Sequence, residues 1–326
     1  MPSPSTSLAT LRPDISESFM EFDLEMDAQG FIANQVFPVI EVASQAGSFG
    51  KIPLAQLLEQ RDTKRAPGSG YKRGAFKFDD AAYACVEHGA EEPIDDREAK
   101  MYANYFNAEV IAGMRAYSSV LRNAEQRVSD AVFNSTTWTG AALTTAVSIE
   151  WSTLATAVPI TNVEAAVNKV YDGSGLWPNA LIINRKVFRN LRNCAQVIDR
   201  ITASGAGSPA KASDVTAAML AAVFDLPYVI VAGSSRNSAT EGQTALPVQI
   251  WSSEYAMVAK VCTSQDFKEP GIGRTFHWSA DGSQIGGATE TYRDETVRSD
   301  IVRVRHDVAE IVLYAAAGHL LSNITA

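Results

Sequence analysis

The stretch that organises this chain is residues 95–134, DDREAKMYANYFNAEVIAGMRAYSSVLRNAEQRVSDAVFN. Alanine or large apolar side chains recur along it at steps of three and four residues, a spacing that predicts one buried face of a helix. A continuous helix of this length would extend roughly 55 to 60 Å at about 1.5 Å per residue. Because that exceeds the width of an ordinary globular core, we expect a spine helix lying along a flat or elongated body. The predicted buried face comprises Ala99, Tyr102, Phe106, Val110, Met114, Tyr117, Leu121, Ala124, Val128 and Ala131.

Acidic residues mark the start of this spine. Asp95 and Glu98 occupy the spacing of an N-cap residue and its N3 partner, which satisfies the free amides of a first helical turn. Glu91, Glu92 and Asp96 add negative charge where the positive end of the helix dipole lies. The same acids could form a cation site, but the start of a helix is the commoner explanation for such a group.

Composition limits the class of protein. The chain has 326 residues, 46% of them hydrophobic, and a net charge of −9, so it can bury a large core as one large or two smaller domains. The negative charge argues against a protein that coats nucleic acid or a membrane surface. Cys85, Cys194 and Cys262 are far apart, which indicates reduced thiols rather than disulfides or a zinc site. The sequence shows neither a signal peptide nor an apolar run long enough to cross a bilayer.

Residues 1–46 form a predicted N-terminal arm. The arm begins polar and then becomes apolar in FIANQVFPVIEVA, residues 31–43. An apolar arm must be buried somewhere. Two alternatives remain open at this point: the arm folds back on its own domain, or it docks on a neighbouring subunit.

Residues 47–89 are predicted to form a long β-hairpin with a basic tip. Strand-like runs at 48–58 and 74–86 flank a turn-forming middle that contains Pro67, Gly68 and Gly70. Residues 61–77, here named the basic tip, hold six basic side chains and one acid, a local charge of +5. The tip is either ordinary solvated surface or a contact to an acidic surface on another copy, and an isolated ribbon gains most from the second arrangement. The candidate inter-subunit contacts are Arg61, Lys64, Arg65, Lys72 and Arg73.

Residues 151–262 alternate predicted helices with buried strands. NALIIN at 179–184 and LPYVIVAG at 226–233 are the clearest strands, and the segment 186–194 between them is a predicted helix. This alternation indicates a small mixed sheet with helices on its faces. Residues 263–326 then return through a glycine-rich loop to the alternating strand IVRVRHDV at 301–308.

No catalytic constellation is found. The four histidines, His88, His277, His306 and His319, lack the spacing of an HExxH zinc site. No GxSxG elbow anchors a nucleophilic serine, and the loop GAGSPAKAS at 205–213 departs from the phosphate-loop pattern where Lys211 is followed by alanine. We therefore expect neither an enzyme nor a cofactor.

The order of these parts resembles the major capsid proteins of tailed bacteriophages, which have the HK97-like fold. The resemblance covers nearly the whole chain and rests on order and length rather than on one motif. It runs through LATLRPDISESF, FIANQVFPVIEVA, the basic hairpin, the long helix, NALIINRKVFRNLRN, LPYVIVAGSS and VRSDIVRVRHDVAEIVLYAAAGHLL. The resemblance implies an α+β fold with an N-terminal arm (1–46), an extended β-hairpin loop (47–89), a peripheral domain with the spine helix (90–150), an axial α/β domain (151–262) and a return into the peripheral domain (263–326).

In function, the resemblance implies a structural subunit that assembles as pentamers and hexamers into an icosahedral shell around double-stranded DNA. It implies a virion location after assembly in the cytoplasm of the bacterial host, with a portal, a possible decoration protein and no membrane. Only about 45 residues precede the hairpin, which implies a separate scaffolding protein. A net negative wall would suit a DNA container, because strong phosphate binding would hinder packing. The alternatives are an encapsulin-like cellular compartment and, in a different class, a soluble α/β enzyme.

Overall fold

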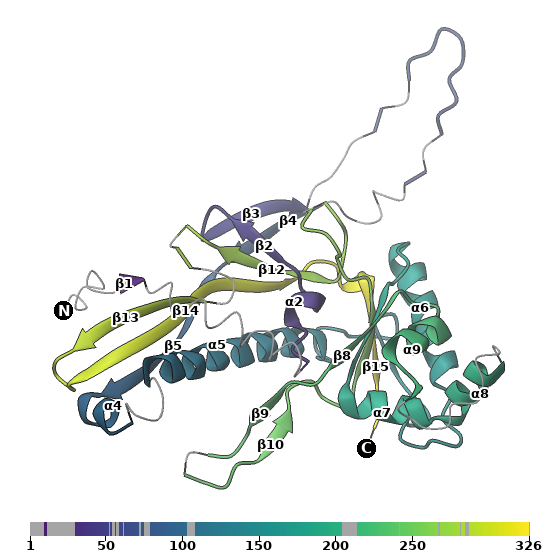
Figure 1. Ribbon diagram of the computed structural model, residues 1–326. Coiled ribbons are helices and arrows are strands. Elements are labelled where there is room, and N and C mark those ends of the chain that lie inside the picture. The colour runs from purple at the N-terminus through teal and green to yellow at the C-terminus, as the bar shows by residue number, and fades with distance from the viewer. Residues whose placement is uncertain are drawn as a thin grey trace.

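The computed structural model describes residues 10–11, 30–51, 53, 56, 59–60, 62–71, 73–74, 79–102, 108–203, 214–240, 242–266, 268–280, 282–283 and 287–325. The described body is elongated, with one sheet and a long helix toward one end and a second sheet covered by helices at the other (Figure 1). Two ribbons project from it on opposite sides. Within the described residues, no helix is both long and apolar enough to cross a membrane.

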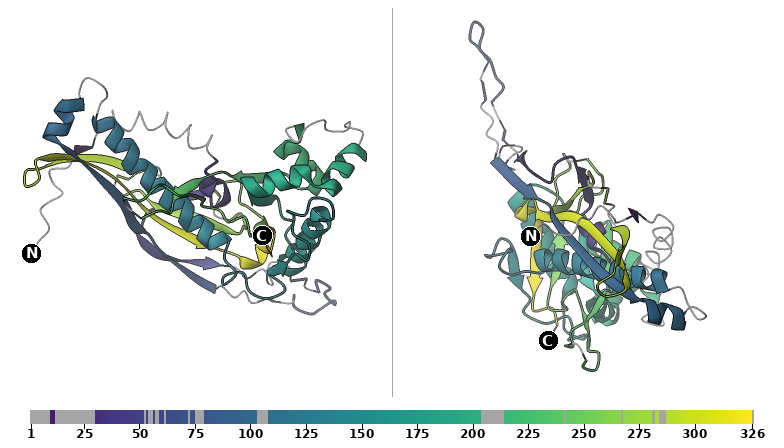
Figure 2. Two further views of the ribbon diagram at one scale, coloured as in Figure 1. Left: turned by 90° about the horizontal axis from the view of Figure 1, so that it is seen from below. Right: turned by 90° about the vertical axis from the view of Figure 1, so that its left-hand side faces the viewer.

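Two helices are described within the predicted spine, on either side of residues 103–107, which lie outside the described residues. Helix α4 spans Asp96–Tyr102 and helix α5 spans Ala108–Val132, and their axes point in different directions (Figure 2). The predicted cap is present, because the Asp95 side chain accepts a hydrogen bond from Arg97 N at 2.7 Å. Asp96 also forms a two-pronged contact with Arg293, at 2.6 and 2.7 Å. This contact fixes α4 to strand β13 (Ala288–Asp294). The longer of the two helices is α5, about 37 Å long at 1.5 Å per residue, and we call it the spine helix.

The buried face of α5 includes small side chains that the stripe of larger residues did not mark. Ala116 and Val120 are buried against Val304 of the neighbouring sheet, together with Tyr117 from the predicted face. Met114 and Leu121 lie at the margin of this contact, half-buried. Alanine lets the helix approach the sheet closely, so the tightest contact line is rotated away from the largest side chains.

Strand β14 (Ser299–Val312) is the centre of the larger sheet. The strand order is β1 (Thr10–Leu11), β13, β14, β12 (Gly273–Trp278) and β2 (Val39–Val42), and β5 (Val86–Asp95) also pairs with β14. Only the β12–β2 pairing is parallel among the described pairings of this sheet. Ion pairs cross it from β14, from Arg303 to Glu91 at 2.6 Å and from Arg305 to Glu290 at 2.9 Å.

The second sheet carries the α/β region predicted from the sequence. Its order is β6 (Thr144–Ala146), β15 (Gly318–Ser322), β11 (Ala256–Ala259), β7 (Ala180–Asn184) and β8 (Tyr228–Ala232). Every residue of β7 is buried, as the apolar run NALIIN predicted. The associated helices are α6 (Pro159–Ser174), α7 (Arg185–Asn193), α8 (Ala195–Ala203) and α9 (Ala217–Phe224). Their buried side chains and the sheet form one hydrophobic core.

Residues 263–326 divide between the two sheets instead of staying in one. Strands β12, β13 and β14 belong to the larger sheet, whereas β15 pairs with β11 and β6 in the second sheet. The short 3₁₀ helix at Ala315–Ala317 connects the two parts. The small-residue stretch YAAAG, residues 314–318, is thus the link by which the chain crosses from one sheet to the other.

Candidate assembly surfaces

The basic tip projects far beyond the body of the subunit, at the upper right in Figure 1. Every described residue between 62 and 74 is exposed. Among the predicted contact residues, Lys64, Arg65 and Arg73 are therefore on the surface, and in the described part of the chain none of them forms an ion pair. Arg61 and Lys72 lie outside the described residues. The structure thus presents positive charge at the far end of a long projection.

Local contacts order the tip. Ser69 N donates to Ala66 O at 3.1 Å, and Gly68 has a φ of +83°, the geometry of a type II turn with proline at its second position. Arg65 donates from Nε to Ser69 O at 2.6 Å and lies over the ring of Tyr71, 4.8 Å from its centroid. Tyr71 is 75% exposed. The tip therefore has an internal structure, yet it offers an aromatic ring and cations to solvent.

The base of the hairpin is anchored firmly. Strand β3 (Ala46–Lys51) pairs with β4 (Asp79–Ala84), and the described ladder ends at Lys51. Lys51 Nζ donates to Leu313 O and lies 4.3 Å from the ring centroid of Tyr314. Burial lowers the pKa of the Lys51 amine. Of the strand predicted over 48–58, the described ladder reaches Lys51. Pro53 has no N–H for a ladder, and Gln56 N donates to the Pro53 carbonyl at 2.9 Å; residues 52, 54, 55, 57 and 58 lie outside the described residues.

Glu125 forms a buried junction between distant parts of the chain. Its side chain, on α5, is 1% exposed. It accepts hydrogen bonds from Ile32 N at 2.9 Å, Ala33 N at 2.8 Å, Trp251 Nε1 at 2.6 Å and Ser234 Oγ at 3.3 Å. The first two donors begin helix α2 (Ala33–Val36), so Glu125 supplies the cap that this short helix lacks locally. The carboxylate therefore ties the spine to the N-terminal segment and to the region beside the second sheet.

Two opposing effects act on the pKa of the Glu125 carboxyl. Removal from water raises the pKa of the Glu125 carboxyl, and its hydrogen bonds lower it, with burial the larger effect. Sequence reasoning missed this residue as a functional one. A signal was present, because Glu125 stands four residues after Leu121 and three before Val128, on the face predicted to be buried. An acid at such a position needs partners.

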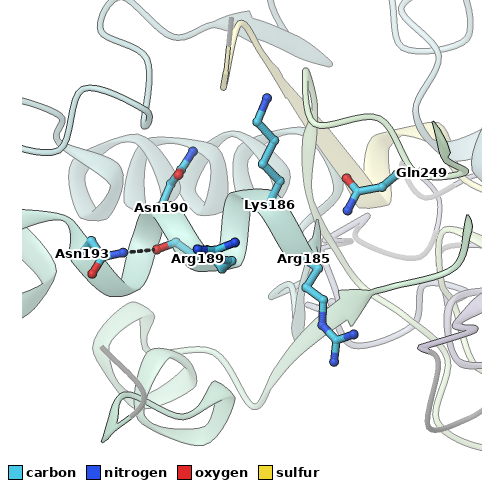
Figure 3. A pocket seen from close by; sticks show the side chains of 6 residues that line it. All are labelled: Arg185, Lys186, Arg189, Asn190, Asn193 and Gln249. Carbon is cyan, nitrogen blue, oxygen red and sulfur yellow. Dashed lines mark hydrogen bonds between the residues drawn. The ribbon is translucent and has the colours of Figure 1, made fainter. Parts of the chain in front are cut away.

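A basic groove lies along helix α7 on the second sheet. It has a volume of about 440 Å³ and is lined by Arg185, Lys186, Arg189, Asn190 and Asn193 of α7 and by Gln249 of strand β10 (Pro247–Gln249) (Figure 3). We call this the α7 groove. Strand β10 pairs with β9 (Ser235–Asn237) in the second projecting ribbon.

The start of α7 is fixed by Asn184. Its side-chain oxygen caps the helix by accepting from Val187 N at 2.8 Å. The Asn184 amide nitrogen donates to Gln249 Oε1 at 2.8 Å and to Trp251 O at 3.0 Å. These contacts hold β10 beside the helix, so both walls of the α7 groove are positioned from one side chain.

Three of the four histidines are buried in the two sheets. His277 and His306 are buried within the larger sheet. His319 is fully buried in the second sheet, where Nδ1 must donate to Ala142 O at 2.9 Å, since a carbonyl only accepts. Its Nε2 lies 2.9 Å from Thr145 Oγ1, which accepts from Lys169 Nζ at 2.7 Å. Burial lowers the pKa of His319. Within the described residues, no group of three or more His, Cys, Asp or Glu side chains is arranged to hold a metal.

The elongated two-sheet body, the spine helix α5 and the projecting hairpin together define the HK97-like capsid fold, which confirms the fold predicted from the sequence. A phage-related protein from Bordetella bronchiseptica RB50 superimposes with a TM-score of 0.66 at 23% identity, over 97% of this chain and 98% of that one. The capsid structure of Cyanophage P-SCSP1u gives a TM-score of 0.57 at 12% identity, over 88% and 86% of the two chains. An encapsulin from Synechococcus elongatus PCC 7942 gives a TM-score of 0.50 at 9% identity, over 90% and 87%.

Among curated proteins, the similar ones are phage capsid subunits by name. The chain is 22% identical over 296 residues to the major capsid protein of Pseudomonas phage JBD67, covering 90% of this chain and 92% of that protein. It is also 22% identical over 298 residues to the major capsid protein of Burkholderia phage BcepMu, covering 90% and 91%. No family model matches the chain.

Proposed function

We propose that this chain is the major capsid subunit of a tailed phage, a structural protein whose copies form an icosahedral shell around double-stranded DNA. The observation that carries the proposal is the similarity to two phage major capsid proteins over nine-tenths of the chain. The fold agrees with this function. An elongated subunit with projections on both sides offers several edges, and symmetric copies present matching surfaces to them.

The assembly model has five segments. They are the N-terminal arm (1–46), the extended hairpin (47–89), the peripheral domain (90–150), the axial domain (151–262) and the returning segment (263–326), whose last strand joins the axial sheet. Pentamers and hexamers of the subunit would close the shell in the host cytoplasm, with a separate scaffolding protein, a portal and, in shells that carry one, a decoration protein as partners. The finished shell would be part of the virion. The subunit itself would perform no catalysis.

We assign the basic tip to contacts between subunits. Lys64, Arg65 and Arg73 are exposed at the end of a projection whose base is fixed by Lys51. Exposed ion pairs within one subunit contribute about 0–1 kcal/mol each. Between subunits, the same charges would steer docking and fix register, and a shell repeats the contact many times.

Electron microscopy of the purified protein, alone and co-expressed with the other structural proteins of its phage, tests the proposal. Closed icosahedral shells are expected, and particles from an infected host should contain nuclease-protected DNA. Shells that enclose a protein cargo and no DNA would favour the encapsulin-like alternative, whose fold is the same. A protein that stays monomeric under all assembly conditions would contradict a shell function of either kind.

A further inference from the structure

Helix α7 is unusually basic for its setting. In a chain of net charge −9, residues 173–198 contain four basic residues and no acid. All four, Arg185, Lys186, Arg189 and Arg192, belong to α7. The uncharged polar side chains of α7 that line the groove beside them are Asn190 and Asn193. This helix is thus a second concentration of positive charge, distant in sequence from the basic tip.

The α7 groove places this charge around a concavity. Arg185, Lys186 and Arg189 are exposed, and in the described part of the chain none of them forms an ion pair. Asn193 Nδ2 donates to Arg189 O at 2.9 Å, and Arg192 stacks on Phe188 at 4.9 Å from the ring centroid. Figure 3 shows the three cationic side chains extending from one helix, Lys186 and Arg185 in opposite directions, with Gln249 beside the start of that helix.

The chemistry of the lining selects the ligand. The groove consists of guanidinium, ammonium and amide groups, and α7 carries no large exposed apolar side chain. Protein interfaces are usually centred on buried aromatic or apolar anchors. Phosphate oxygens, in contrast, are bound by arginine, lysine, asparagine and glutamine side chains. The lining therefore favours a phosphate backbone over the surface of a second protein.

The dimensions fit a short piece of one strand. From Arg185 to Asn193 the helix rises about 12 Å, which corresponds to about three or four nucleotides at roughly 3.4 Å per residue of one DNA strand. The asparagine and glutamine amides could form hydrogen bonds with base edges, but they lie beside three cations, which bind phosphates. Because phosphates carry no sequence information, we expect contact that is independent of the DNA sequence.

We propose that the α7 groove binds the phosphate backbone of DNA. The inference rests on the proposed function, in which the shell encloses DNA. About three phosphate contacts give a log–log salt slope near −2.7 for duplex DNA, so raising salt from about 50 to 200 mM weakens binding about 40-fold. Such contact is weak enough to let DNA move during packing, and it becomes substantial only when many subunits act together.

Fluorescence anisotropy of a labelled 30-base-pair duplex, titrated with unassembled subunit at low salt, tests this site. R185E/R189E is compared with R97E/R200E, which reverses two exposed cations elsewhere and changes net charge equally. The α7 variant should bind at least tenfold more weakly and lose about 1.8 from the salt slope. The control variant should stay within about twofold of wild type. Weaker DNA binding by R185Q/R189Q would show that loss of the two positive charges is enough to reduce affinity, without added negative charge. Circular dichroism checks that each variant is folded.

Three results would overturn the inference. Wild-type subunit could fail to bind DNA at low salt, or the α7 and control variants could lose affinity equally. Polyglutamate could compete as well as unlabelled DNA at equal charge, which would identify an acidic protein surface as the ligand. Because the assay uses unassembled subunits, failure of wild-type protein to form shells would contradict the proposed function without altering this measurement.

Discussion

Replacement of Glu125 should show how much of the subunit depends on one buried carboxylate. Glu125→Ala removes the acceptor for two backbone amides at the start of α2, for the Trp251 indole and for Ser234. Each buried donor left without an acceptor costs about 1–3 kcal/mol. Because Ser234 can rotate its hydroxyl, we count three donors and expect a loss of about 4–6 kcal/mol after partial relaxation or entry of water. That is a large part of a typical unfolding free energy of about 5–15 kcal/mol.

Glu125→Gln should cost less, about 2–3 kcal/mol. Its carbonyl oxygen retains one acceptor, and a neutral amide avoids the burial of charge that raises the pKa of Glu125. Trp251→Phe removes one donor and leaves the carboxylate its other partners, so about 1–2 kcal/mol is expected. In the double variant Glu125→Gln/Trp251→Phe the two losses should not add, because the residues share one hydrogen bond.

Urea unfolding of the unassembled subunit, followed by tryptophan fluorescence and circular dichroism, measures these losses. Asp130→Ala is the matched control: it is an exposed acid on the same helix, bonded only to Gln126 among the described contacts, and should change stability by less than about 0.5 kcal/mol. Limited proteolysis should also become faster near residues 30–36 in the Glu125 variants. If Glu125→Ala destabilises the subunit no more than Asp130→Ala does, the hydrogen-bonded junction is not a major source of stability.

Three further outcomes are expected. Leu121→Asp should lower the unfolding free energy by about 1–3 kcal/mol, because the charge would lie half-buried at the margin of the spine contact. Exposed Ser119→Asp should change it by less than about 1 kcal/mol; equal soluble yields and urea midpoints would show that the buried face is misassigned. Reversal of Arg61, Lys64, Arg65, Lys72 and Arg73 to glutamate should leave circular dichroism unchanged and abolish most shell formation, with any remaining assembly more sensitive to salt; wild-type shell yield by electron microscopy would identify the basic tip as ordinary surface. Burial lowers the folded-state pKa of His319, so the unfolded chain binds a proton at a higher pH than the folded chain does. The contribution of His319 to stability should therefore be full above about pH 6.5 and fall as the pH drops below that value. Thermal unfolding should show less of this acid-dependent loss in His319→Gln, and an unchanged pH profile in that variant would exclude His319 as its source.

Features encoded by neighbouring residues were predictable from the sequence. The basic tip was identified because its charges and its Pro67–Gly68 turn lie within a few positions of one another. Strand β7 was identified because a strand buried on both faces reads as a continuous apolar run. The spine was found from its period, but its closest contact involves Ala116, whose small side chain carries little weight in a pattern of large residues.

Features that depend on distant residues were not predictable. The donors that satisfy Glu125 come from positions 93 and 126 residues away along the chain, and no local pattern specifies them. Helix α7 was predicted over 186–194, yet its charges were indistinguishable from a solvated helix face. Only the fold brings Gln249 beside them and forms a groove.

The pairing of β5 with β14 has a consequence for how the subunit folds. Ser299 is opposite Asp95 and Val308 is opposite Val86, so the sheet beneath the spine closes only when segments about two hundred positions apart meet, a topology associated with slow folding. Until β14 arrives, α5 lacks the surface that covers Ala116 and Tyr117. A newly made chain would then pass through an interval with an exposed apolar helix face and an unpaired strand edge, both prone to wrong association. When many copies are made at once, the folding rate would then limit how many chains are available for assembly.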